Sequence, residues 1–177
     1  QALPSNLPQH DIIGACYSCC MFGLELKNEA VHMKALQALC SVYIGNPRLI
    51  LLTEREGMVE WIFSSHFSNN VHRQFLISLR YMMLAEEERL EKAVAIENME
   101  KSGISAATKS NKVDGTRELD SDATIAGFVL QQHLPKITKF LSDPIALTRL
   151  SAVRLVGTLL RQGMLCPLDV LGHLVAL

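Results

Sequence analysis

The chain has 177 residues, a formal net charge of −1 and a hydrophobic fraction of 49%. This length allows one domain with a substantial core, and the low net charge excludes a chain that is basic throughout, as a nucleic-acid clamp would be. Aromatic residues make up only 6%, which favours packed helices over a β-sandwich.

The first ten residues, QALPSNLPQH, contain neither the charged nor the apolar region of a signal peptide. No run of about 18 uninterrupted apolar residues occurs, so we expect no membrane-spanning helix. Because the chain does not begin with Met and stops inside the apolar run GHLVAL, we expect it to be a piece of a longer protein.

Residues 11–26 are apolar nearly all round, as in a helix that is covered on several sides. This segment contains the cluster C-Y-S-C-C, and an odd number of cysteines in apolar surroundings indicates a reducing compartment. Since no second C-x-x-C or H-x-x-x-H pair is present, we interpret the cluster as packed thiols and not as a zinc site. The five cysteines are Cys16, Cys19, Cys20, Cys40 and Cys166.

Two further helices are predicted from their starting residues. Asn28 is the expected N-cap of a helix over 29–45, which the turn Gly-Asn-Pro ends. Thr53 and Glu56 have the spacing of a capping box, which predicts a helix over 53–66.

A long helix is predicted over 70–101, and its acidic second half, AEEERLEKAVAIENMEK, is interpreted as a solvent-exposed extension. The next segment, 102–121, is rich in Ser, Gly, Thr, Lys and Asp without periodicity, which predicts a flexible linker. Order then resumes in the helical sequence DATIAGFVLQQHLPKITKFLSD, where Pro135 predicts a kink or break. The remaining signals are a turn at Asp143 and Pro144, a helix that ends near Gly163, and a last helix over 168–177 opened by Pro167.

The predicted helices follow a repeated pattern of helix, short turn and helix over 11–45, 53–101 and 122–163. The second helix of each pair carries a basic residue within its apolar arc, with apolar residues four and seven positions later. These residues are His32, His72 and Arg149, with Lys34 as an alternative register in the first pair. The repetition predicts an all-α fold, an α-solenoid of helical hairpins.

Arg149 lies where a hydrophobic core is expected, and a charge is tolerated there only if it is paired or hydrogen-bonded. We therefore expect Arg149 to reach Asp143 or the turn of the next repeat, linking units of the stack. In the alternative interpretation, Arg149 contacts a partner or DNA.

Several stretches resemble known helical-repeat proteins. The pattern D-P-x-x-x-T-R-x-x-A over 143–152 looks like HEAT repeats. Three segments resemble the large HEAT-repeat subunit of the cohesin loader, the Nipped-B family of sister chromatid cohesion proteins: MKALQALCSVYIGNP over 33–47, NVHRQFLISL over 70–79 and LLRQGMLCPLDVLGHLVAL over 159–177. On this assignment 1–101 holds two HEAT-type pairs, 102–121 is an insertion, and 122–177 holds a further pair and the start of the next.

The resemblance implies a nuclear function in sister chromatid cohesion. Proteins of this family are large hooked solenoids that act with a smaller loader subunit. They engage the cohesin ring, promote its ATPase cycle and help to place it on DNA without sequence preference. They are not enzymes themselves, so the resemblance implies neither catalytic residues nor a cofactor.

Basic residues are concentrated in the last third of the chain. Lys136, Lys139, Arg154 and Arg161 are candidates for contact with DNA phosphates or with a partner, and the alternative is an ordinary solvated face. His32, His72, Arg149 and Asp143 are candidates for contacts between repeats.

The sequence contains no G-x-x-x-x-G-K-S/T phosphate loop and no G-x-S-x-G elbow, and its histidines share no spacing with carboxylates or cysteines. We therefore expect a binding protein. A generic HEAT-repeat scaffold or adaptor remains open as the alternative function, and an all-helical enzyme is disfavoured because no acid, base and nucleophile converge.

Overall fold

The computed structural model describes residues 9–55, 57–101 and 126–175, and within them every secondary-structure element is a helix. The predicted all-α class is therefore confirmed for the described residues. A helical stretch at 126–132 precedes α7. The named elements are α1 (Gln9–Glu25), α2 (Glu29–Gly45), α3 (Leu49–Arg55), α4 (Met58–Ile62), α5 (Asn69–Lys101), α7 (Leu134–Lys139), the short 3₁₀ helix η1 (Phe140–Ser142), α8 (Ala146–Arg161) and α9 (Pro167–Val175).

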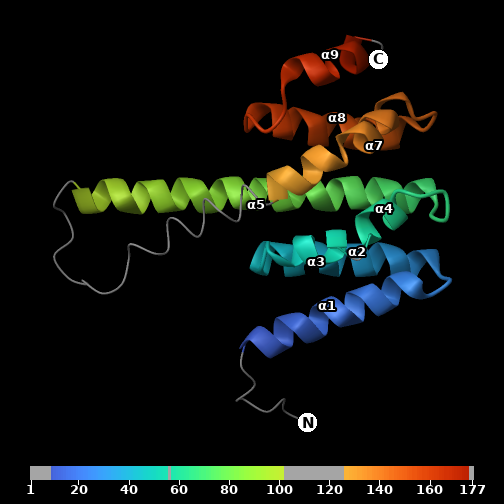
Figure 1. Cartoon of the computed structure of the whole chain (residues 1–177), viewed down its shortest axis with the longest axis horizontal. Coiled ribbons are helices and arrows are strands. Elements are labelled where there is room, and N and C mark those ends of the chain that lie inside the picture. The colour runs from blue at the N-terminus through green and yellow to red at the C-terminus, as the bar shows by residue number, and fades with distance from the viewer. Residues whose placement is uncertain (1–8, 56, 102–125, 176–177) are drawn as a thin grey trace.

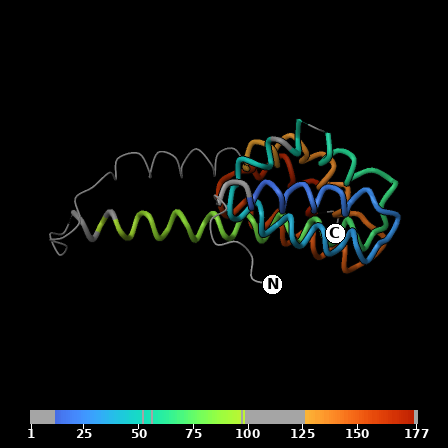
Figure 2. Tube along the Cα trace, turned by 90° about the horizontal axis from the view of Figure 1, so that it is seen from below, coloured from blue at the N-terminus to red at the C-terminus, as the bar shows by residue number. Residues whose placement is uncertain are grey.

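Three long helices, α2, α5 and α8, lie side by side and run in the same direction (Figure 1). Side chains join each neighbouring pair, since Gln37 bonds Gln74 over 3.2 Å and Arg80 bonds Thr158 over 3.3 Å. Helix α1 packs against α2, while the short helices α3, α4 and α7 lie on one side of α5 (Figure 2).

Helix α1 buries one stripe against α2, formed by Tyr17, Cys20 and Leu24. The two helices approach closely at Gly23, because a Cβ built there would lie 3.1 Å from Cβ of Ala35. The prediction that the cysteine cluster is packed away holds only for Cys20 within it. Cys16, Cys19 and Cys166 are exposed, while Cys20 and Cys40 are buried.

The predicted N-cap of α2 is confirmed, since the Asn28 side chain accepts hydrogen bonds from the main-chain N–H groups of Ala30 and Val31. The observed bounds, Glu29–Gly45, are those predicted. An Asx residue at this position satisfies donors that the first helical turn leaves without partners.

The predicted single helix over 53–66 is wrong. Two short helices occupy this region, and they meet at Gly57, whose φ of 68° lies in the left-handed region and stops α3. Thr53 does not cap a helix, because α3 begins at Leu49 and Thr53 lies within it. Glu56, the other residue of the predicted capping box, lies outside the described residues.

Instead, Thr53 is fully buried and joins three helices. Its hydroxyl donates to the carbonyl of Leu49 over 3.1 Å, and it lies 3.1 Å from the Tyr17 hydroxyl and 2.6 Å from the Tyr43 hydroxyl. A buried hydroxyl placed among such partners fixes the position of α3 against α1 and α2.

The long helix α5 begins one residue before the predicted start, and its second half projects beyond the stacked helices (Figures 1 and 2). This extension is rich in residues that favour helix formation. It is also stabilised by the ion pair of Glu88 with Lys92, one turn further along, whose charged atoms lie 2.6 Å apart. Glu86 departs from the solvent-exposed interpretation, since it is buried and bonds Arg89 over 2.7 Å.

The break predicted at Pro135 is confirmed, because a turn at His133 separates the helical residues 126–132 from α7. The predicted helix that Pro167 opens is also present, as α9. The predicted linker over 102–121 lies outside the described residues. Among the helices that the structure describes, none is both long and apolar enough to cross a membrane.

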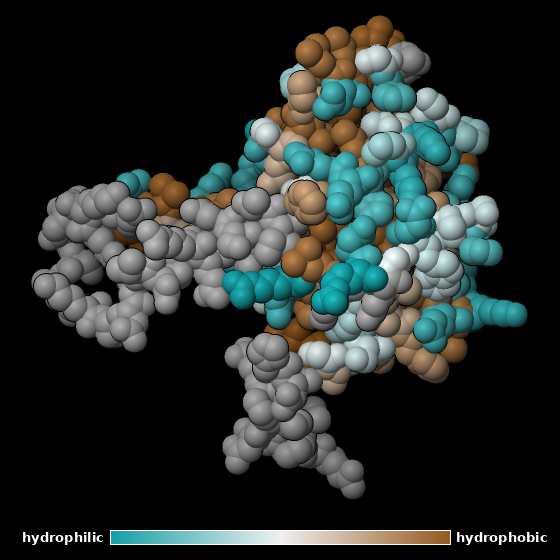
Figure 3. Space-filling view, in the orientation of Figure 1, coloured by the Kyte–Doolittle hydropathy of each residue, from teal (hydrophilic) through white to brown (hydrophobic). Residues whose placement is uncertain are grey.

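Both outer helices of the stack expose large apolar side chains. Leu168, Leu171 and Val175 of α9 are 77%, 51% and 79% exposed, and Figure 3 shows hydrophobic residues gathered there at the top of the molecule. At the other end, Ile12 and Phe22 of α1 are exposed. The stack therefore presents an apolar surface at each end.

Candidate functional site

The three parallel helices begin in the same way. The first helical turn places His32, His72 and Arg149 equivalently, because their amides donate to the carbonyls of Asn28, Ser68 and Ile145, four residues earlier in each case. The recurring position is a property of the structure and does not depend on the choice of sequence register.

Each of these basic side chains also donates to a main-chain carbonyl of the turn before its helix. His32 bonds the carbonyl of Leu26, and Nε2 of His72 bonds the carbonyl of Ser64 over 3.0 Å. Arg149 bonds the carbonyl of Asp143 over 2.6 Å. The basic residue thus gives a hydrogen-bond partner to a carbonyl that would otherwise have none in the tight turn.

The expected contact of Arg149 with Asp143 is made to the main-chain carbonyl and not to the carboxylate. The carboxylate instead accepts a hydrogen bond of 2.7 Å from the main-chain N–H of Ile145. A second Arg149 bond, to the carbonyl of Pro144, lies in the same turn. These bonds hold one turn together and do not reach another helix pair.

The rings of the two histidines contact aromatic residues that follow later in the chain. The His32 ring meets Phe67 edge-on with centroids 5.0 Å apart, and the His72 ring lies 5.2 Å from that of Phe140 in η1. His72 is buried, so this contact forms part of the packing between α5 and the segment before α8.

The four basic residues proposed to contact DNA do not form one patch. Lys136 and Lys139 belong to α7, and Lys136 forms an ion pair with Glu60 of α4. Arg154 and Arg161 belong to α8, beside α5. The structure therefore divides these residues between the short helices and the parallel helices.

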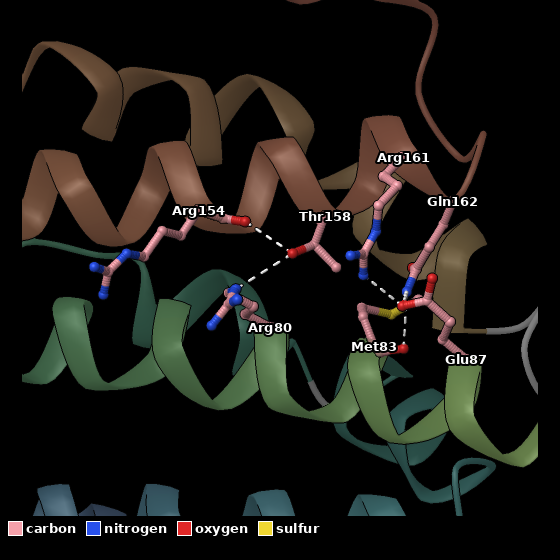
Figure 4. Close-up of polar contacts among 7 residues, drawn as sticks. All are labelled: Arg80, Met83, Glu87, Arg154, Thr158, Arg161 and Gln162. Carbon is pink, nitrogen blue, oxygen red and sulfur yellow. Dashed lines mark hydrogen bonds and ion pairs between the residues drawn. The ribbon is translucent and has the colours of Figure 1, made fainter.

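Arg161 forms an ion pair across the α5–α8 contact. Its Nη2 lies 2.6 Å from Oε2 of Glu87, and Nε2 of Gln162 donates to the same oxygen over 3.2 Å, as Figure 4 shows. Its side chain is 60% exposed, so the pair contributes at most about 1 kcal/mol to stability.

A second group of cations lies along the same contact, and of its members only Arg154 was expected from the sequence. Arg80 of α5 donates to the Thr158 hydroxyl, and the exposed Arg154 reaches toward α5 beside it (Figure 4). Arg73 precedes Arg80 by seven residues on the same side of α5. None of these three arginines forms an ion pair with a described residue. The seven-residue spacing from Arg73 to Arg80 and Glu87 was the signal available in the sequence.

A groove of 590 Å³ lies between α2 and α5. Its polar part contains the amides of Gln37 and Gln74, bonded to each other over 3.2 Å, and its apolar part contains Ile77 and Tyr81, the latter 55% exposed. Amides beside apolar side chains suit the main chain and side chains of a bound peptide.

In the part of the chain that the structure describes, no group of three or more His, Cys, Asp or Glu residues is placed to hold a metal ion. The site candidates that the geometry offers are two surfaces, the α2–α5 groove and the arginines of the α5–α8 contact.

Neither the protein-family models nor the curated proteins include a match to this chain.

Proposed function

We propose that this chain is part of a HEAT-type α-solenoid of the cohesin-loader kind, a nuclear scaffold that acts with a smaller subunit to engage the cohesin ring and DNA. The observation that carries the proposal is the equivalent placement of His32, His72 and Arg149 in three parallel helices. The chain binds and positions its partners, and the hydrolysis of ATP takes place on the cohesin ring.

The recurrence supports a solenoid because it appears three times within one chain. Each unit has a basic residue at the same distance from the start of its second helix, and each bonds its own turn. Units built on one plan bury their apolar faces by stacking on their neighbours. The apolar side chains that α1 and α9 leave exposed are faces on which such a stack accepts a further helix pair.

The loader identity rests on the three segments that resemble that family. They coincide with most of α2, the first part of α5, and the end of α8 together with α9. The resemblance therefore follows the parallel helices of the stack and its last helix.

In this proposal a DNA contact made by this chain lies on the α7 side, at Lys139, because Lys136 and Arg161 are each held by a glutamate. Arg154 lies apart from that side, on α8 beside α5. A few phosphate contacts add a salt-sensitive increment to a larger footprint and do not hold DNA alone.

The test is a reconstitution. The protein that carries this chain, purified with its smaller partner, is added to the cohesin ring and DNA, and ATP hydrolysis is measured. We expect a rate above that of the ring alone. Unchanged hydrolysis together with no retention of the ring on the protein would refute the loader function.

The groove between α2 and α5 favours a second candidate, a general peptide-binding scaffold. The matched variants are Tyr81→Asp in the groove and Phe128→Asp in the helical residues 126–132, since Tyr81 and Phe128 are 55% and 56% exposed. If the cohesin ring binds in this groove, Tyr81→Asp lowers ring binding and Phe128→Asp does not. A protein that binds peptides in the groove but never the ring is a general scaffold.

A further inference from the structure

The exposed face of α8 carries an ordered series of side chains. Leu147, Leu150, Arg154, Gly157 and Arg161 follow one another at intervals of three or four residues, which places them on one side of a helix. All five are exposed, with Leu147 at 55% and Leu150 at 43%. The face is therefore apolar at its start and basic further along.

Gly157 lies in the middle of this face, and no contact among the described residues requires a glycine there. A Cβ built there meets no atom within 4 Å, and its φ is not positive. Glycine inside a helix costs about 0.5–1 kcal/mol relative to alanine, so its presence here weakens α8. A glycine on an exposed helix face lets another chain approach the helix closely.

The charge beside Gly157 is unbalanced. Arg154 and Arg80 form no ion pair with any residue that the structure describes, and Arg80 uses only its Nε toward Thr158. One turn away, the carboxylate of Glu87 is already held between α5 and α8 by Arg161 and Gln162. The same contact thus shows how a carboxylate is bound between these helices.

We propose that this face, together with Arg80, docks an acidic peptide segment of a protein partner. The carboxylates of the segment bind Arg154 and Arg80, its backbone passes over Gly157, and its apolar side chains pack on Leu147 and Leu150. Arg–carboxylate pairing supplies geometric specificity, and the leucines supply apolar contact. The inference assigns one protein contact of the proposed scaffold.

The leucines and the glycine distinguish a peptide from DNA as the occupant. DNA phosphates use arginines, but they gain nothing from exposed leucines at the start of the same face. A surface that binds DNA also needs several cations free to contact phosphates. On this face, however, Glu87 already neutralises the charge of Arg161.

The experiment uses a random 12-residue peptide library displayed on phage and selected on the complete chain. We expect the selected peptides to combine Asp or Glu with large apolar residues. Because the library is independent of cohesin, a failure of the loader function leaves this result untouched, and the reverse also holds.

Two variants then test the surface. Gly157→Leu fills the open position and is expected to weaken the selected peptides by about tenfold or more while leaving the melting temperature unchanged or higher. Arg154→Gln is expected to weaken them by about tenfold through loss of a charge-assisted hydrogen bond. Gly14→Leu in α1, where a Cβ also meets nothing, and Arg55→Gln at the exposed end of α3 are the controls.

Three outcomes would overturn the proposal. The selection yields no acidic and apolar preference, or Gly157→Leu binds the selected peptides as well as the unchanged protein. In the third, Arg154→Gln lowers the affinity for a duplex DNA and its dependence on salt while peptide binding stays the same, and the face is then a DNA contact.

Discussion

Glu29, at the start of α2, shows how a single exposed side chain connects two of the parallel helices. Its Oε1 accepts a hydrogen bond of 2.9 Å from Nδ2 of Asn70, in the first turn of α5. The hydrogen bonds from Asn70 and then Ser68 hold the pKa of this carboxyl below its ordinary value. Both donors favour the ionised form.

Asn70→Ala should therefore raise the pKa of Glu29 toward its ordinary value, as measured by NMR titration. Because the folded-state pKa lies below the unfolded one, the contribution to stability is present above the unfolded pKa. It is lost as the pH falls through the folded pKa. The destabilisation caused by Asn70→Ala should accordingly be seen at neutral pH and vanish in acid.

Glu88 provides the internal control for that titration. Its pKa is also lowered, but by the hydrogen bond and charge of Lys92. Asn70→Ala should leave the Glu88 titration in place, and an equal movement of both carboxyls would contradict the assigned cause.

At the scale of the element, the helix pairs are positioned by a few close contacts. Gly23 allows α1 to approach α2 at Ala35, and Thr53 connects α3 to tyrosines of α1 and α2. The sequence suggested a cap at Thr53 because the residue has the spacing of one. Tertiary packing gave it another role.

Thr53→Val keeps the shape of the side chain but removes the hydroxyl shared with Tyr17 and Tyr43. We expect a loss of about 1–3 kcal/mol in the free energy of unfolding, measured in urea, because buried hydrogen bonds are removed. Ser41→Ala, at an exposed position of α2, should change it by less than about 0.5 kcal/mol. Equal effects of the two variants would show that the Thr53 contacts do not hold α3.

Gly23→Leu should destabilise the fold by about 1–3 kcal/mol, because the side chain enters the contact with Ala35 and forces the two helices apart. The matched variant Gly14→Leu, in the same helix but with no atom near its Cβ, should be neutral or stabilising. Thermal unfolding of the pair measures the difference, and a more stable Gly23→Leu protein would show that the helices can separate without cost.

Across the whole molecule, α2, the first half of α5 and α8 form the centre. The second half of α5 and the helix α9 extend from it. The most buried large side chains of α2 and α5 include Leu36, Leu39, Leu76 and Leu79. In contrast, Val94 and Ile96 in the second half of α5 are 55% and 50% exposed.

Amide hydrogen exchange should reproduce this division. We expect slow exchange in α2, the first half of α5 and α8, and fast exchange in the second half of α5 and in α9, because few apolar contacts resist local opening there. Mass spectrometry of peptic fragments measures both regions at once. Equal protection along the entire length of α5 would contradict this expected difference between its two halves.

The sequence by itself determined the helical class, the bounds of α2 and α5, the break at Pro135 and the recurring basic residue. These features depend on caps, on proline and on the spacing of apolar residues along one helix, and all of them act within a few residues.

Only the tertiary structure decided which side chains meet. The division of α3 from α4 depends on a left-handed Gly57, and the burial of Thr53 depends on two tyrosines supplied by other helices. The same is true of the α5–α8 arginines, because Arg80 and Arg154 are far apart in the chain and adjoin only when the helices stack. Contacts between distant segments follow from packing geometry, which the local pattern of residues does not encode.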